Sequence, residues 1–141
     1  MKRMKEKTAN IQRLTKAEEQ VMQILWDLNE AVVKDIVDQF NDPKPAYTTV
    51  ATVLKVLEKK EFVTHRKIAN THLYIPAISK AEYSKFQLSN LLTNYFNGSY
   101  PKMATFFARM NDFSIQELEE MISQTEEELK NEKKNNNGYT N

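Results

Sequence analysis

Hydroxyl and amino side chains gather on one short stretch, residues 45–60, at spacings that place them along one side of a helix. They are Thr48, Thr49, Thr52, Lys55 and Lys59. Each threonine costs a helix roughly 0.5 kcal/mol relative to alanine, so a cluster of threonines indicates a task other than helix stability. Short hydroxyls can hydrogen-bond to base edges and lysines can neutralise phosphates, which makes duplex DNA the candidate ligand. The alternative is a threonine-rich amphipathic helix that binds no ligand.

The apolar spacing within and before residues 45–60 predicts the helices that hold this stretch in place. Apolar residues recur at helical spacing on its other side, at Val50, Val53, Leu54 and Leu57, so that side should pack on a core. Upstream, Thr15 and Glu18 predict a capping box before a helix over residues 16–28. A second short helix is predicted over residues 32–40, and the two prolines that follow cannot continue it. Two short helices, the second with polar residues at its start, form the helix-turn-helix pattern.

After residue 61 the pattern changes to that of a β-hairpin. Residues 62–68 and 73–75 are rich in strand formers, and Asn70 between them can take the positive φ of a tight turn. Arg66 and Lys67 lie near its tip. A hairpin directly after a recognition-type helix is the wing of a winged helix, whose basic side chains hold the flanking DNA backbone. The alternative is an ordinary basic hairpin.

The C-terminal part predicts three more helices, over residues 80–97, 102–110 and 115–129. Their apolar side chains exceed what a small winged helix can cover, so they predict a twofold homodimer, and a helical subdomain packed within one monomer is the alternative. The predicted dimerisation residues are Leu88, Leu91, Leu92, Tyr95, Phe96, Phe106, Phe107, Leu118, Met121 and Ile122.

The predicted fold class is mainly α with a small β-hairpin, a winged helix-turn-helix followed by a C-terminal helical dimerisation region. The predicted division of the chain is a flexible basic arm at 1–13, a winged-helix DNA-binding domain at 14–78, a helical dimerisation domain at 79–130 and a disordered tail at 131–141.

Composition narrows the class of protein. The chain has 141 residues, two glycines and no cysteine, which argues against glycine-rich phosphate loops, disulfides and thiolate metal sites. Its net charge is only +1, but residues 46–80 carry six bases and two acids (6 − 2 = +4), whereas residues 81–141 carry six bases and nine acids (6 − 9 = −3). A basic segment followed by an acidic one indicates that residues 46–80 bind a polyanion and that residues 81–141 have a different task. The absence of cysteine fits an intracellular protein. Neither a membrane span nor a signal peptide is recognisable.

Catalytic and metal sites find little support. His65 and His72 could meet across the hairpin, but a cross-strand histidine pair without nearby acids is usually part of the solvated surface. The run at residues 126–128, three glutamates, is most simply a solvated helix end. The sequence therefore predicts no enzyme, no catalytic residue, no metal and no cofactor.

Several short segments together resemble the penicillinase repressor (BlaI/MecI-like) family over about residues 13–130. These segments are Leu14–Glu18, Val21–Met22, Leu25–Trp26, Ala46–Val50, Thr52–Leu54, Leu57, Lys59–Lys60 and Tyr74–Pro76. The resemblance implies a cytoplasmic bacterial winged-helix repressor that dimerises through its C-terminal helices and occludes a promoter at a palindromic DNA operator. It also implies groove and wing contacts to DNA from Tyr47, Thr48, Thr49, Thr52, Lys55, Arg66 and Lys67.

The sequence departs from that family's pattern at three places. Ala51 stands where some relatives place a basic side chain, so the operator sequence cannot be carried over. The best-known members are inactivated by a membrane sensor protease that cuts an Asn-Phe bond, but the matching residues 104–108 read Ala-Thr-Phe-Phe-Ala. A sensor-protease partner is therefore left open. The paired cysteines of copper-responsive relatives are absent, which disfavours copper sensing. The alternative function is a winged-helix module for protein contacts, with the acidic part docking a partner.

Overall fold

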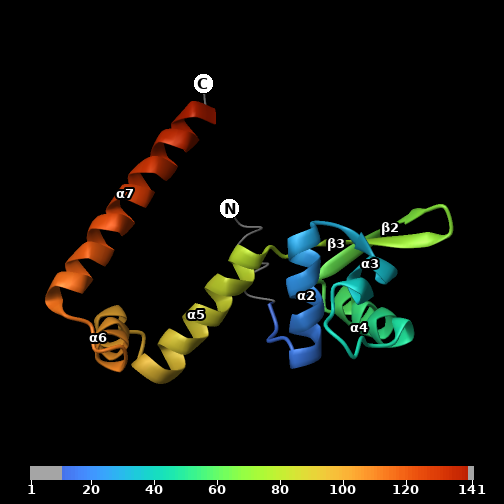
Figure 1. Cartoon of the computed structure of the whole chain (residues 1–141), viewed down its shortest axis with the longest axis horizontal. Helices are drawn as coiled ribbons and strands as arrows, with labels where there is room; N and C mark the ends of the chain where they lie inside the picture. Colours follow the sequence, from blue (N-terminus) through green and yellow to red (C-terminus); the bar gives the residue numbers. More distant parts are fainter. Residues whose placement is uncertain (1–10, 140–141) are drawn as a thin grey trace. The chain divides into compact units, whose positions relative to one another are not determined.

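The computed structural model describes residues 11–139, with side chains through residue 135 (Figure 1). The chain divides into two compact units, of which the first ends at Asn90 and the second starts at Leu91. The division falls inside helix α5 (Lys80–Phe96). The functional boundary expected between residues 78 and 79 stays a prediction, because it concerns tasks rather than packing.

The first unit combines helices with a small antiparallel sheet (Figure 1). Its elements are α2 (Lys16–Leu28), β1 (Ala31–Val32), α3 (Val33–Asp38), α4 (Tyr47–Lys59), β2 (Val63–Ile68), β3 (Thr71–Pro76) and the start of α5. The strands lie in the order β1-β3-β2, so that β2 and β3 form the predicted hairpin. Helices α3 and α4 followed by this hairpin form a winged helix-turn-helix, and the predicted fold class is confirmed.

The core of the first unit lies between the helices and the sheet. Its largest fully buried side chains are Phe62, Met22, Leu25, Ile36, Leu54, Leu57, Val50 and Val63. Three of the four apolar residues predicted to line the inner side of α4 are buried, and the fourth, Val53, is partly buried. As its apolar spacing predicts, one side of α4 packs on the core, and the polar side of the helix is exposed to solvent.

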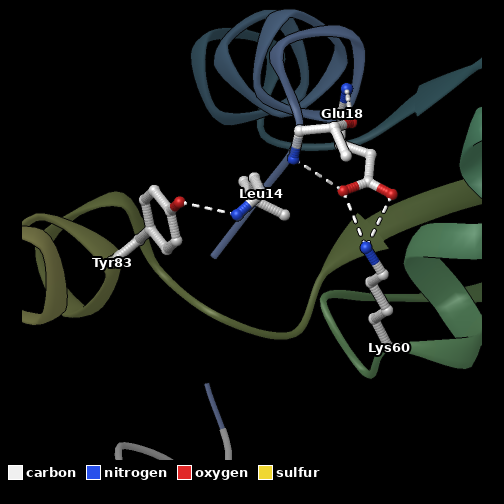
Figure 2. A network of polar contacts seen from close by, with 5 residues as sticks. Leu14, Glu18, Lys60 and Tyr83 are labelled. Atoms are coloured by element: carbon white, nitrogen blue, oxygen red, sulfur yellow. Dashed lines mark hydrogen bonds and ion pairs between the residues drawn. The ribbon is translucent and has the colours of Figure 1, made fainter. Parts of the chain in front are cut away.

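The segment before α2 is held more firmly than the sequence predicts. Ile11 is only 6% exposed and belongs to the core, and the backbone N–H of Leu14 donates to the Tyr83 hydroxyl at 2.9 Å (Figure 2). The predicted flexible arm is therefore wrong for Ile11, because an apolar side chain this close to the core is more stable buried than exposed. Residues 1–10 of that arm lie outside the described residues.

The capping box that begins α2 is confirmed. The Thr15 hydroxyl accepts from the backbone N–H of Glu18, and Oε1 of Glu18 accepts from the backbone N–H of Thr15 at 2.9 Å. The same carboxylate binds Lys60 at the end of α4, with 2.9 Å from Nζ to each oxygen (Figure 2). One side chain therefore joins the start of α2 to the end of α4.

Two local predictions for the sheet need correction. Residues 31 and 32 form strand β1, which pairs with Leu73 and Tyr74, and α3 begins only at Val33. A short apolar run fits a buried strand as well as a helix, and here the open edge of β3 decides between them. In the hairpin turn, the positive φ of 55° falls on Ala69 rather than on Asn70.

The second unit continues α5 and adds α6 (Tyr100–Met110) and α7 (Ile115–Tyr139). Helix α6 begins two residues earlier than predicted, because Ser99 caps it and Pro101 is tolerated in the first turn of a helix. The expected disordered tail from residue 131 is wrong at least to Tyr139, since α7 continues through it. Residues 126–134 are mainly glutamate and lysine, which are good helix formers. No helix within the described part of the chain is long and apolar enough to cross a membrane.

Candidate nucleic-acid interface

Four of the predicted DNA-binding residues form a single exposed row on α4. Thr48, Thr52, Lys55 and Lys59 follow one another at intervals of four, three and four residues, and all four side chains are exposed. Because an α-helix has about 3.6 residues per turn, these intervals keep the side chains on one face, opposite the buried Leu57. We call these four residues the α4 row. It presents two hydroxyls near the start of the helix and two ammonium groups near its end.

The other two residues predicted on this helix lie beside the α4 row rather than in it. Tyr47 is 56% exposed and lies on the same side of the helix as Glu58, which follows it by about three turns. Thr49 lies on the opposite side, about two turns before Val56, which is 39% exposed. Sequence reasoning missed Val56, because a valine inside an apolar helix resembles a core residue. An exposed valine methyl next to hydroxyls could contact the methyl group of a thymine.

The hydroxyl of Thr52 is partly committed within the helix. It donates to the backbone carbonyl of Thr48 at 2.8 Å. This bond explains how a threonine is tolerated at an exposed helix position. Because its proton is used in this bond, the hydroxyl can only accept a hydrogen bond from a ligand. In the major groove of DNA, the donors it could accept from are the amino groups of adenine and cytosine.

The two basic residues of the wing lie on opposite faces of the hairpin. Successive side chains of a strand alternate between faces, so Arg66 and Lys67 point apart. On one face, Arg66 Nη2 lies 3.7 Å from Glu30 Oε2 in an exposed ion pair. On the other face, Lys67 is exposed and lies opposite His72 in the register of β2 and β3. The structure therefore places Lys67 on the α4 side of the sheet and Arg66 on the far side, a separation that strand periodicity alone could have predicted.

A group of titratable side chains lies between α4 and the wing. Glu58 on α4 accepts a hydrogen bond from Nδ1 of His65 on β2, and the ring of His65 stacks on His72 with centroids 4.2 Å apart and planes 13° apart. The expected meeting of the two histidines is confirmed, but the premise that no acid lies near them is wrong. Burial raises the pKa of Tyr74 beside them, and the charges of Glu58 and Tyr47 add to this. No group of three or more His, Cys, Asp or Glu among the described residues could hold a metal ion.

Lys60 does not belong to the exposed basic surface. Its ammonium group is held by Glu18, a buried residue. Burial acts to raise the pKa of Glu18, but hydrogen bonds from the Thr15 backbone and from Lys60 outweigh it and keep that pKa below its usual value. Glu18 is therefore a buried carboxylate that stays charged because the Thr15 backbone and Lys60 both stabilise its charged form. On α4 and the wing, the exposed basic residues are then Lys55, Lys59, Arg66 and Lys67.

The predicted dimerisation residues are mostly exposed, although a few are covered. Those exposed on α5 to α7 are Leu88, Leu91, Tyr95, Phe106, Phe107 and Ile122. Leu92 is buried, and Phe96, Leu118 and Met121 are partly buried. Within the second unit, Phe96 packs on Phe106 with ring centroids 5.4 Å apart. Leu88 lies in the first unit and the other nine lie in the second, and their shared task stays a prediction.

Comparison with known proteins identifies a family. The model of the family described as penicillinase repressor matches residues 14–127, which is most of the chain. A search of curated proteins found no match.

Three solved structures are similar at low identity. The solution structure of monomeric BlaI from Bacillus licheniformis in complex with the blaP half-operator is 24% identical, covers 52% of this chain and 90% of that chain, and gives a TM-score of 0.44. A mutant of ZitR from Lactococcus lactis is 17% identical over 87% of this chain and 77% of that chain, with a TM-score of 0.40. The adhesin competence repressor AdcR from Streptococcus pyogenes is 18% identical over 86% of each chain, with a TM-score of 0.42. Because these scores lie below 0.5, the assignment rests on the family model.

Proposed function

The chain belongs to the penicillinase repressor family, and from that premise we propose that it is a homodimeric, sequence-specific DNA-binding repressor that occludes a promoter at a palindromic operator. The observation that carries this proposal is the α4 row, in which hydroxyls and lysines share the exposed face of a helix whose other face is buried. A helix that enters the major groove needs such a face, because bases are read by short polar groups and the backbone is held by cations. The family is one of repressors and is not defined by a catalytic activity.

In this proposal the threonines and Tyr47 read base edges, and Lys55, Lys59, Arg66 and Lys67 contact phosphates. Each phosphate neutralised on duplex DNA contributes roughly 0.9 to the slope of log affinity against log salt. Four contacts from each of two protomers would give a slope of roughly 7. Arg66 has to exchange its exposed partner Glu30 for a phosphate, which costs little because an exposed ion pair contributes about 1 kcal/mol or less.

The proposed dimer uses the second unit. Its helices leave large apolar side chains exposed, among them Tyr95 at 76% and Ile122 at 59%. Along α7, Ile115, Leu118, Ile122 and Leu129 recur at intervals of three, four and seven residues, which is the apolar pattern of a helix that packs lengthwise on a partner. A second copy of the same face would cover this surface and would present two α4 rows to two half-sites.

A sensor protease stays a candidate for the relief of repression. Phe106 and Phe107 are exposed near the middle of α6. A cut between them would separate α7 from the first unit and remove part of the proposed dimer surface. The test is mass spectrometry of the protein from induced cells, where a fragment ending within residues 104–108 is expected and an intact chain would refute cleavage.

The proposed function is tested by selecting genomic DNA fragments that the purified full-length protein retains and sequencing them. We expect a palindrome with half-sites about one helical turn apart, or a multiple of it, and an affinity that falls steeply with salt. Asymmetric sites would contradict the dimer, and affinity that does not respond to salt would contradict the phosphate contacts. If no fragment is retained, the chain is better explained as a winged-helix module that binds a protein through its acidic second unit.

A further inference from the structure

A pair of side chains that no DNA contact requires joins α4 to the wing. Glu58 lies in the last turn of α4, and its Oε1 accepts from Nδ1 of His65 on β2. We propose that Glu58 and His65 are positioning residues, which hold the wing at a fixed place beside α4 so that the wing cations reach the DNA backbone while α4 lies in the groove. This inference rests on the proposed function and deepens it, because neither residue has to touch DNA.

The outer part of the wing needs such a support. Strand β1 pairs only with Leu73 and Tyr74, so the hairpin beyond them has two strands. From Thr64 to Thr71 every residue is exposed, so this part of the hairpin buries little. A two-stranded hairpin without a covered face is marginally stable in water. Its direction must therefore be set where it contacts another element.

The contact with α4 reaches both strands of the wing. His65 on β2 stacks on His72 on β3, and the rings of both lie near Tyr74, at 5.8 Å and 6.2 Å between centroids. One hydrogen bond to Glu58 therefore holds a stack of rings that spans the hairpin. On the other face, the ion pair of Arg66 with Glu30 is longer and more exposed than the contact between His65 and Glu58, so it is the weaker constraint.

The same contact determines where Lys67 points. His65 and Lys67 are two residues apart on β2 and therefore lie on the same face. Holding the ring of His65 against α4 keeps Lys67 on the side of the α4 row. Without this hydrogen bond, the wing should move relative to α4, and Lys67 should bind phosphate less often in register with that helix.

The experiment needs a control for charge, because removing any acid near DNA raises affinity for the polyanion. Glu61 provides it. Glu61 is exposed just after α4, three residues beyond Glu58, so Glu61→Gln removes the same charge in the same region. Glu58→Gln removes that charge and also weakens the bond to His65. His65→Gln removes the bond from the wing side and serves as a second variant should Glu58→Gln fold poorly.

The measurement is a mutant cycle on the full-length protein, with operator affinity and its salt slope read by fluorescence anisotropy. The variants are Glu58→Gln, Glu61→Gln, His65→Gln, the wing double variant Arg66→Ala with Lys67→Ala, and Glu58→Gln combined with that double variant. We expect Glu58→Gln and His65→Gln to weaken operator binding roughly five- to tenfold and to lower the salt slope by roughly 1 for each wing cation that no longer binds a phosphate. Glu61→Gln should leave binding unchanged or tighter.

The cycle separates a positioning role from a general structural one. Once the wing cations are gone, Glu58→Gln should cause no further loss of affinity, because Glu58 acts only through them. If Glu58→Gln behaves like Glu61→Gln while the wing double variant weakens binding, the positioning inference is wrong and the proposed function stands. If Glu58→Gln weakens binding equally with and without the wing cations, Glu58 acts elsewhere and the inference is also wrong. If the wing double variant has no effect at all, the wing contacts of the proposed function are wrong and the inference fails with them.

Discussion

Adjacent lysines at the end of α4 should have opposite roles, and exchanging each for methionine tests this. Lys60 binds both carboxylate oxygens of Glu18 at 2.9 Å, whereas Lys59 is exposed in the α4 row. Lys60→Met should destabilise the first unit and leave the salt dependence of DNA binding nearly unchanged. Lys59→Met should leave stability nearly unchanged and lower the salt slope by roughly 1 per protomer.

The size of the Lys60 effect follows from the burial of its partner. Removing one member of a buried ion pair costs about 3–5 kcal/mol, because the other charge is left without compensation. Glu18 has a side chain that is 8% exposed, but the side chain of Lys60 is 25% exposed, so water can partly replace the missing ammonium group. Glu18 also keeps its hydrogen bond from the Thr15 backbone. We therefore expect a loss of about 2 kcal/mol in the free energy of unfolding, or about 8–16 °C in Tm for a unit of this size.

The same pair gives a pH dependence with a definite sign. The pKa of Glu18 is lowered in the folded chain, so its contribution to stability is present above the ordinary glutamate pKa of about 4.3 and is lost as pH falls through the folded pKa. Without Lys60, the pKa of Glu18 should lie above its wild-type value, because the hydrogen bond and the charge of Lys60 both lower it, so the variant takes up a proton at a higher pH. The stability difference between the wild type and Lys60→Met should therefore shrink between pH 7 and pH 4.

Urea unfolding followed by Trp26 fluorescence is the assay, because the single tryptophan of the chain lies in α2 and reports on the first unit. A Lys60→Met variant whose unfolding free energy lies within about 0.5 kcal/mol of wild type would refute the reasoning about the buried pair. So would a loss of salt slope as large as that of Lys59→Met, since Lys60 would then be a phosphate contact.

Three further predictions concern the proposed interface and dimer. Lys55→Ala should weaken binding to operator and to unrelated duplex DNA alike, with a salt slope lower by roughly 1 per protomer. A loss of affinity for the operator alone would indicate that Lys55 reads a base. Thr52→Val keeps the shape of the side chain but removes the oxygen, so discrimination between operator and mutant sites should fall by about 1–3 kcal/mol in competition assays. An unchanged preference for the operator would exclude base reading by Thr52. Tyr95→Asp or Ile122→Glu should shift the protein from dimer to monomer in analytical ultracentrifugation without changing Trp26 fluorescence, and an unchanged mass would place the dimer contact elsewhere.

Local spacing explains why most of the fold and the α4 row could be predicted. Apolar residues on one side of α4 and polar ones on the other need only helical periodicity, and the capping boxes at Thr15 with Glu18 and Ser114 with Glu117 need only a span of three residues. Each of these features is determined within one or two turns of chain. The DNA-reading roles assigned to the row are of another kind, because they depend on a ligand, and they stay predictions.

The features that sequence reasoning missed depend on partners distant in sequence. Strand β1 exists because residues 31 and 32 lie beside β3, more than 40 positions away. Lys60 meets Glu18 at a separation of 42 residues, and nothing near Lys60 distinguishes it from the exposed Lys59. The bond between Glu58 and His65 crosses the turn between α4 and β2, so its geometry depends on how the sheet packs on the helix. Charge counted along the chain therefore overestimates the exposed basic surface.

The anchoring of α5 links the fold of the first unit to the geometry of the proposed dimer. The first turn of α5 is held to the winged helix by the Tyr83 hydroxyl, which accepts from Leu14, and Trp26 Nε1 donates to the carbonyl of Ile78 just before the helix at 2.9 Å. Tyr83 also packs on Trp26 and Phe62, with ring centroids 6.0 Å and 5.7 Å apart. Within the first unit, the start of α5 is thus held by the same core that positions α4. In a twofold dimer made by the second unit, the spacing of half-sites would then depend on the chain after Asn90, while the reading of each half-site would not. Substitutions beyond that point should therefore change which spacings are bound before they change which bases are read.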